Sequence, residues 1–289
     1  MTGRIPLLVT ACAVWLAGCA VGGQAPHTLA RTAQPAIATP VTDWLRTLPA
    51  PAQPVDVAVF RYPDLTGQYK PSDSLTTYSR AVSQGGLNVL LRALLETGNG
   101  AWFRVMDRSQ LDDVLRERSV IREVRASFTG PDGEPLAPPG PIRYAGVLFS
   151  GGIVAYDSNV RSAGAGLRIW GVGGSTQIRH DLITVSLSAV SSVSGEVLHS
   201  VMVQKGVYAV LNEAGAFRFL DDRTLLELEA GIATNEPGLL ALRQAIEMAV
   251  YQLIIEGADK GLWGFSDAAS GAFAREQFEA RVAVGGVDG

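Results

Sequence analysis

The sequence is poor in charge, in aromatic side chains and in cysteine. Charged residues make up 18% and aromatic residues 7% of the 289 residues, with 24 basic against 28 acidic side chains. Without a basic surplus the chain cannot neutralise many phosphates, so nucleic acid is not expected as a partner. The two cysteines both lie within the first 19 residues, which excludes a disulfide framework. A hydrophobic share of 47% excludes wholesale disorder and allows a sizeable core.

Residue combinations that carry catalysis or bind metals are also scarce. The histidines outside the N-terminal region, His180 and His199, lack the cysteine or paired-histidine spacing of zinc sites. The glycine-rich stretch 171–176 lacks the lysine of a phosphate-binding loop, and no Gly-x-Ser-x-Gly elbow occurs. The pair Asp221-Asp222 fits a hairpin turn better than a catalytic carboxylate pair. We therefore expect no enzyme, no catalytic residues, no cofactor and no metal site.

The N-terminus carries the most specific signal. Arg4 precedes a short apolar stretch, Ile5 to Ala17, and Leu16-Ala17-Gly18-Cys19 follows the pattern of a bacterial lipobox. Residues 1–18 are therefore predicted to be a signal peptide, and Cys19 the acylated first residue of the mature chain. Two or three acyl chains give stable membrane anchoring. Ala20 stands where an aspartate would retain a lipoprotein at the inner membrane, so we expect the Gram-negative outer membrane.

Composition divides the rest of the chain. Residues 19–54 are rich in Pro, Ala, Thr and Gln and predict an extended tether, interrupted only by Trp44 and Leu45. A folded periplasmic domain is expected over 55–264, and 265–289 is assigned to a C-terminal tail. No internal stretch reaches the ~18 uncharged apolar residues of a membrane-spanning helix.

Strands and helices alternate within 55–264, which predicts an α/β or α+β domain. Alternating residues predict strands at 55–59 and 183–189, a buried apolar run predicts one at 142–156, and further strands are expected at 102–106 and 197–203. Helical periodicity predicts three helices. The first covers 79–97, the second follows Ser109 as its capping residue, and the third runs from Asn235 to Gly257 or Gly261. The apolar face of the second helix would contain Leu111, Val114, Leu115 and Ile121.

Two segments, 159–180 and 207–231, do not fit a water-soluble core. Apolar and charged residues alternate in the second, with a turn expected near Asp222, and each leg has the length of about ten residues typical of membrane strands. An ordinary solvent-facing hairpin is the alternative. In a transmembrane hairpin the lipid-facing residues would be Phe217, Phe219, Leu226 and Leu228, and the lumen-facing residues Arg218, Glu227 and Glu229.

Several motifs, in order along the chain, resemble those of the CsgG family of curli secretion lipoproteins. A relative that anchors the holdfast of stalked bacteria is an alternative identity within this resemblance. The matching stretches are Asp64–Pro71, Tyr156–Ser162, Thr176-Gln177, Ala214–Phe219, Thr234–Pro237, Ile246-Glu247 and Gly261–Trp263.

The resemblance implies a ring in which each subunit contributes two transmembrane β-hairpins to one oligomeric β-barrel in the outer membrane. Four strands per subunit, against the 36 of the largest known barrels, give about nine subunits. One subunit alone would leave unpaired strand edges in lipid, so a homo-oligomer is required.

The family also narrows its channel with a loop, here at about 71–79. Tyr78 and Thr77 would take the places of the family's Phe and Asn, and Ser72 or Asp73 that of its Tyr. The constriction expected from this loop is therefore less apolar than the family's. A core aromatic at the start of the following helix is the alternative for Tyr78.

Two functions remain open at this point. The first is a pore that exports unfolded curli-like or adhesin polypeptides without nucleotide hydrolysis, aided by a periplasmic accessory protein. The second is a structural outer-membrane anchor for a surface adhesin or holdfast. The two differ in whether the lumen is open and traversed.

Overall fold

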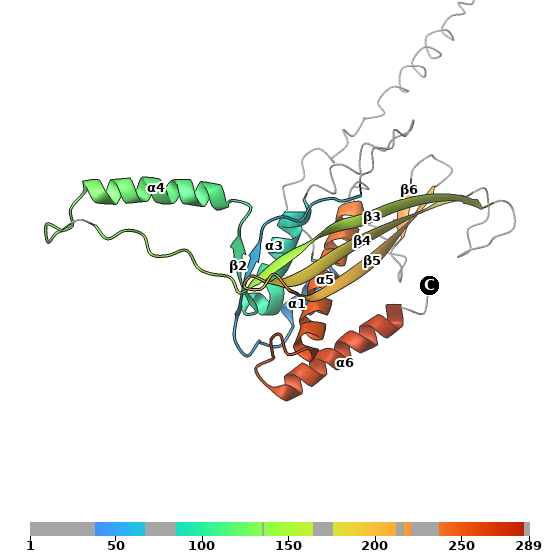
Figure 1. Ribbon diagram of the computed structural model, residues 1–289. Helices are drawn as coiled ribbons and strands as arrows, with labels where there is room; N and C mark the ends of the chain where they lie inside the picture. Colours follow the sequence, from blue (N-terminus) through green and yellow to red (C-terminus); the bar gives the residue numbers. More distant parts are fainter. Residues whose placement is uncertain are drawn as a thin grey trace, which may run out of the picture. The chain divides into compact units, whose positions relative to one another are not determined.

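The structure is a computed structural model that describes residues 38–66, 85–134, 136–163, 176–211, 217–220 and 237–285 (Figure 1). All of these ranges belong to one compact unit, Ala38–Gly289. Its helices are α1 (Pro40–Arg46), α3 (Gly86–Glu96), the short 3-10 helix η2 (Thr97–Gly100), α4 (Leu111–Ser127), α5 (Pro237–Asp259) and α6 (Ala268–Gly285). Its strands are β1 (Val55–Val59), β2 (Phe103–Asp107), β3 (Val147–Ala163), β4 (Thr176–Ser191), β5 (Val197–Leu211) and β6 (Phe217–Leu220).

These strands form one mixed sheet in the order β2-β1-β3-β4-β5-β6. Strand β1 runs parallel to β2 and β3, whereas β3 to β6 are joined antiparallel. Parallel pairs need crossover connections, which α3 and α4 occupy, whereas antiparallel neighbours need only hairpins. The predicted mixed α/β fold is confirmed.

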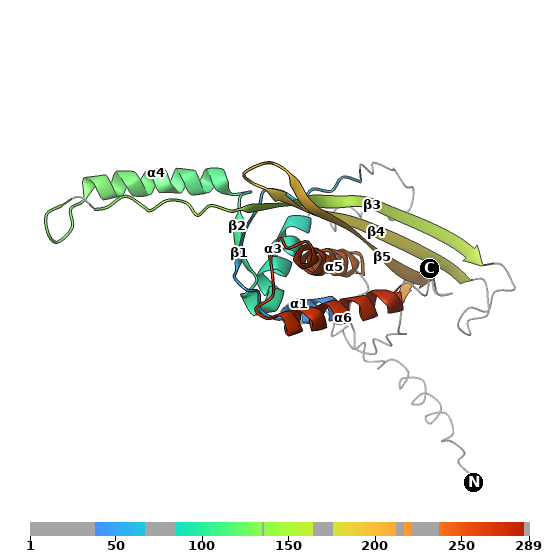
Figure 2. The same ribbon diagram turned by 60° about the horizontal axis from the view of Figure 1, so that its bottom comes forward.

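Helices cover one face of this sheet. Figure 2 shows α3 and α5 directly beneath the strands, with α1 and α6 on their far side. Helix α5 packs against β4 and β5, and its Leu242, Ile246, Val250 and Leu253 are fully buried, as helical spacing of these residues predicts. By length and composition alone α5 is the one helix of the described residues that would qualify as a membrane span, but 67% of that stretch is buried inside the protein.

The folded domain begins earlier than the predicted Val55. Helix α1 starts with Pro40 at its first position, and Thr39 closes a capping box with Thr42. Leu45 is fully buried against the core. The predicted tether contains Thr39 and Pro40, which here begin a helix. The part of the predicted tether from Thr39 onwards therefore belongs to the fold.

Helix α4 differs from expectation in its packing. No residue of this helix is buried, and Val114 and Leu115 are both more than 40% exposed. Ser109 does not cap it, because its hydroxyl and backbone N–H both bind the Asp107 carboxylate at 2.6 and 2.8 Å. The predicted apolar face therefore does not pack on the core, and Figure 1 shows α4 projecting away from the sheet.

The C-terminal part also folds further than expected. Helix α5 ends after Asp259, and Gly261 at φ +71° turns the chain, the conformation that favours glycine. Residues assigned to a tail include α6, in which Ala274 is buried.

Helix α3 begins at Gly86 after a turn at Gly85, and strand β3 begins at Val147.

Candidate functional site

Most of the predicted site residues lie outside the described part of the chain. The membrane and loop residues concerned are Cys19, Ser72, Asp73, Thr77, Tyr78, Leu226, Glu227, Leu228 and Glu229. Of the others, Phe217, Arg218 and Phe219 are described in the backbone of β6 only. What the structure gives is the framework that would hold these residues.

Strands β3 and β4 form one long antiparallel hairpin. Their pairing runs from Val147 and Ser191, next to the core, to Ala163 and Thr176 at the far end, with a bulge between Ile153 and Ala155. Both strands are much longer than the usual five or six residues, with 17 and 16. Figure 2 shows their far ends curving beyond the helix layer. The turn of this hairpin falls within the predicted segment 159–180.

Strands β5 and β6 form a second hairpin, with a different turn from the predicted one. Leu211 pairs with Phe217 and Tyr208 with Leu220, so the chain reverses between 211 and 217 rather than near Asp222. Glycine and alanine at 214–216 carry little polarity, so the turn there left no sign in the alternation pattern. The pattern that starts at Phe217 therefore begins after the turn and does not include the first leg of the hairpin. The turn prediction was wrong by several residues.

The segment that leads from β1 towards the predicted constriction loop is joined to β3. Leu65 N–H donates to the Ile153 carbonyl at 2.8 Å, and Ile153 N–H donates to the Pro63 carbonyl at 3.0 Å. Asp64 accepts from the Thr66 N–H at 2.9 Å, which makes a local turn at the end of this bridge. The bridge therefore fixes the chain just before residue 67.

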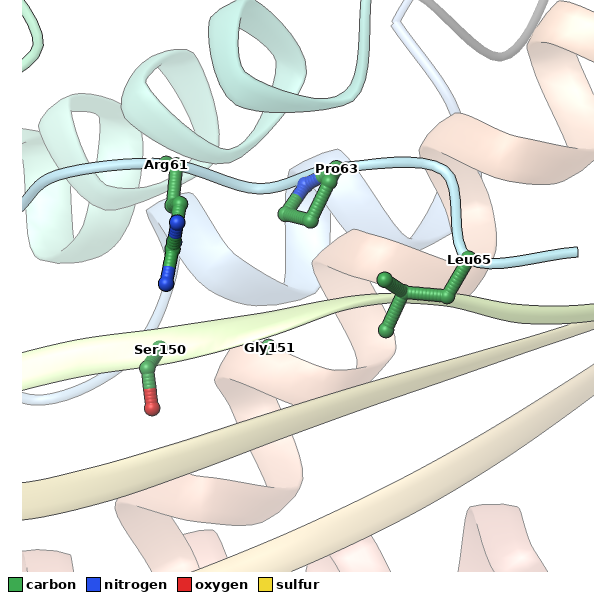
Figure 3. Close-up of a pocket in the computed structure, with 5 residues that line it drawn as sticks. All are labelled: Arg61, Pro63, Leu65, Ser150 and Gly151. Atoms are coloured by element: carbon green, nitrogen blue, oxygen red, sulfur yellow. The ribbon is translucent and has the colours of Figure 1, made fainter. Parts of the chain in front are cut away.

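An open hollow of about 530 Å³ lies where this segment meets β3, lined by Arg61, Pro63, Leu65, Ser150 and Gly151. Figure 3 shows the Arg61 and Leu65 side chains extending from the segment towards the strand. The hollow is a surface feature next to the bridge and contains no catalytic set of residues.

The chain that returns from the predicted loop, at the start of α3, lies against Tyr62 of the same segment. Tyr62 is 4% exposed, and its hydroxyl donates to the Ser186 carbonyl on β4 at 3.0 Å. A Cβ on Gly86, the first residue of α3, would lie 3.0 Å from the Tyr62 ring. Burial raises the pKa of Tyr62 well above its usual range, so the phenol stays protonated and keeps its donor. Tyr62 therefore contacts both the sheet and the return of the chain.

A buried polar network joins the N-terminal helix α1 to the core helix α5. Glu247, 2% exposed, accepts from the hydroxyls of Thr39 and Thr42 at 2.5 and 2.7 Å. It also accepts from Arg243 Nε at 2.7 Å, and Arg243 Nη2 donates to the Thr42 hydroxyl at 3.1 Å. Arg46 of α1 pairs with Glu96 of α3 at 3.2 Å. We call Thr39, Thr42, Arg243 and Glu247 the α1 latch.

Thr39 and Thr42 stand at the start of the described domain, on the C-terminal side of the predicted lipid anchor in the sequence. A buried carboxyl group is costly unless it is paired and hydrogen-bonded, and the two threonines and the arginine supply those partners to Glu247. Sequence reasoning listed Glu247 only as part of a family motif. The available signal was the Arg243–Glu247 spacing of four in an otherwise apolar helix.

A second polar cluster joins β5 to the end of α5. His199 Nε2 lies 2.7 Å from Glu256 Oε2, and Lys260 Nζ lies 2.8 Å from His199 Nδ1. Because a lysine ammonium can only donate, this geometry fixes the His199 tautomer with its hydrogen on Nε2. Within the described residues no group of three or more His, Cys, Asp or Glu side chains could hold a metal ion.

The geometry defines a class: a mixed α/β domain whose sheet is prolonged by the long antiparallel hairpin β3–β4 and by a second hairpin, β5–β6, of which four pairs are described. The family model described as "Curli production assembly/transport component CsgG" matches residues 42–280, and the chain belongs to this family. The CsgG proteins of Escherichia coli K12 and Salmonella typhimurium LT2 are each 38% identical to it over 225 residues, which cover 78% of this chain and 79% of theirs.

Solved structures give weaker likenesses. A PelC dodecamer from Paraburkholderia phytofirmans matches with a TM-score of 0.27 and 13% identity, over 70% of this chain and 89% of that one. A putative neuraminyllactose-binding hemagglutinin homolog from Helicobacter pylori matches with a TM-score of 0.31 and 11% identity, over 81% and 93%. Likenesses this weak carry no functional argument.

Proposed function

We propose that this protein is an outer-membrane lipoprotein that forms an oligomeric pore for the export of unfolded, curli-like polypeptides. The observation that carries the proposal is the prolonged sheet of a chain whose relatives are named curli production assembly/transport components. Beyond Ile153, strand β3 continues from Val154 to Ala163, the length of about ten residues that a tilted membrane strand needs.

The edges of this prolonged sheet support an oligomer. Among the described residues, β3 beyond Ile153 pairs only with β4, and β6 pairs only with β5. Unpaired backbone groups at two such edges are not tolerated in lipid, and copies of the chain would satisfy them by joining β3 of one subunit to β6 of the next. With four strands from each subunit, about nine copies would form a barrel of the largest known size.

The remaining elements have matching roles in this proposal. Cys19 carries the acyl chains that hold the subunit at the membrane, and the α1 latch joins that anchor to the domain. Phe217 and Phe219 face lipid, and Arg218 faces the wet lumen. The loop containing Ser72, Asp73, Thr77 and Tyr78 narrows the channel. Transport needs no nucleotide hydrolysis, and a periplasmic accessory protein delivers the cargo.

Planar-bilayer recording tests the pore. The purified oligomer should give conductance steps on the order of nanosiemens, as wide aqueous barrels do, and deletion of residues 207–231 should abolish them. Tyr78→Ala should raise the conductance while rings still form, because each subunit loses one aromatic side chain from the narrowest ring. Wild-type rings that form but never conduct would refute the pore and favour a structural anchor for a surface adhesin.

A further inference from the structure

The segment 67–84 enters and leaves the described fold at two places that are each held by contacts of described residues. Its entry follows Thr66, directly after the bridge between Asp64 and Ile153, and its exit precedes Gly85 and Gly86. Tyr62 belongs to the segment that leads to the entry, and its ring packs on Gly86 at the exit. A loop whose two ends are both held has far fewer positions available to it.

The contact between the entry segment and β3 depends on the absence of a side chain at Gly152. A Cβ on Gly152 would lie 2.5 Å from the Pro63 carbonyl oxygen and 3.2 Å from Leu65 Cδ1. Such a distance to a backbone oxygen is closer than real Cβ atoms come, so any side chain here must push the entry segment off the strand. The two hydrogen bonds between Pro63, Leu65 and Ile153 lie beside Gly152 and would lengthen with that displacement.

Tyr62 holds the same segment through a different strand. Its hydroxyl bonds the Ser186 carbonyl of β4, and Ser186 pairs with Gly152 of β3. Tyr62 and Gly152 thus join the entry segment to adjacent points on the hairpin that runs on towards Ala163 and Thr176. Neither residue belongs to the stretches that carry the family resemblance.

We infer that Tyr62 and Gly152 are positioning residues, a clamp that ties both ends of the constriction loop to the β3–β4 hairpin and so sets the width of the channel. The inference rests on the proposed pore and adds to it the residues that fix its narrowest part. The channel wall and the loop then move together, because one set of backbone contacts joins them.

Two substitutions test the clamp in the mature, acylated oligomer. Gly152→Ala adds one methyl group against the Pro63 carbonyl, and Tyr62→Phe removes only the hydroxyl that bonds Ser186. Gly146→Ala is the control for the first, because a Cβ there meets nothing within 4 Å. Tyr144→Phe is the control for the second, because it removes the hydroxyl bonded to Ser192 from a side chain 62% exposed.

Amide hydrogen exchange measures the clamp itself. The Leu65 amide, which donates to Ile153, should exchange about fivefold faster or more in both clamp variants, while the amides of β1 keep their protection. Both controls should exchange like the wild type. Unchanged Leu65 exchange in the clamp variants would overturn the inference, whether or not the oligomer conducts.

Single-channel recording measures its consequence. With ring yield unchanged, the mean conductance of Gly152→Ala should rise by about twofold with added open-channel noise, and that of Tyr62→Phe should change in the same direction by less. Faster exchange with wild-type conductance would overturn the role in channel width while leaving the pore intact. Wild-type rings that do not conduct would refute the pore, and the inference with it. If Gly152→Ala forms no rings, Tyr62→Phe decides.

Discussion

Glu247→Leu should destabilise the domain strongly, because it breaks the α1 latch at its centre. The substitution removes the acceptor of three hydrogen bonds and takes from Arg243, 8% exposed, its ion-pair partner on α5. Breaking a buried ion pair from one side costs about 3–5 kcal/mol. Since domains have only about 5–15 kcal/mol of stability, this is a large fraction of the total.

The double variant Arg243→Met/Glu247→Leu separates the cost of removing one partner from the worth of the pair. Replacing both charges with apolar side chains of similar volume leaves no guanidinium that has lost Glu247, so the double variant should recover most of the loss. Urea denaturation of the mature chain carrying Cys19→Ser gives the free energies of unfolding, and hydrogen exchange in α1 shows whether that helix detaches.

Two outcomes would contradict this prediction. A single-variant cost below about 1 kcal/mol would mean that Glu247 behaves as a surface ion pair. A double variant less stable than Glu247→Leu would mean that the two threonines alone do not hold α1, and that the charges themselves are required.

Three further predictions follow from the proposed membrane site and the second polar cluster. Cys19→Ser should abolish acylation and move the chain out of the outer-membrane fraction; unchanged fractionation with normal function would contradict the lipid anchor. Phe219→Lys should lower the yield of rings, at a cost of about 2–4 kcal/mol near the bilayer midplane, whereas Arg218→Glu, on the opposite face of β6, should mainly change ion selectivity. Equal effects on ring yield would refute the assignment of lipid and lumen faces. His199→Leu should lower the free energy of unfolding by about 1–3 kcal/mol. The Glu256 carboxylate loses its imidazole donor and the Lys260 ammonium loses its imidazole acceptor. A urea-derived change under about 0.5 kcal/mol would show that solvent replaces the imidazole.

Local patterns predicted the strands and core helices well. The alternation at 183–189 lies within β4, and the periodic residues Leu242 to Leu253 are the buried face of α5. Each of these depends on residues close in sequence, whose spacing alone decides which face is apolar. Helix α1 was missed because proline and threonine mark both extended tethers and helix starts, and the choice depends on α5, about 200 residues away.

The site could be predicted only as far as motifs reach. The lipobox placed Cys19, whereas the resemblance placed the two hairpins and the constriction loop along the sequence and put Asp64 and Glu247 within matching stretches. It could not show that Tyr62 meets Ser186 or that Gly152 meets Pro63, because these contacts join residues 124 apart in the first case and depend on the sheet register in the second. Nothing in the spacing of such residues reveals that they touch.

Helix α4 shows why periodicity can predict a helix correctly and its partner wrongly. An isolated helix of this length is marginal in water, so something must hold it. Here it is an extended return segment: Arg125 Nη1 donates to the Ala137 carbonyl at 2.6 Å, and Arg118 Nη2 donates to the Pro139 carbonyl at 3.3 Å. Proline has no N–H to pair in a sheet, so the backbone of this proline-rich segment needs other partners. The planar guanidinium groups donate to its carbonyls. The helix is thus oriented by its arginines, and residues such as Val120 and Val124 are left nearly half exposed.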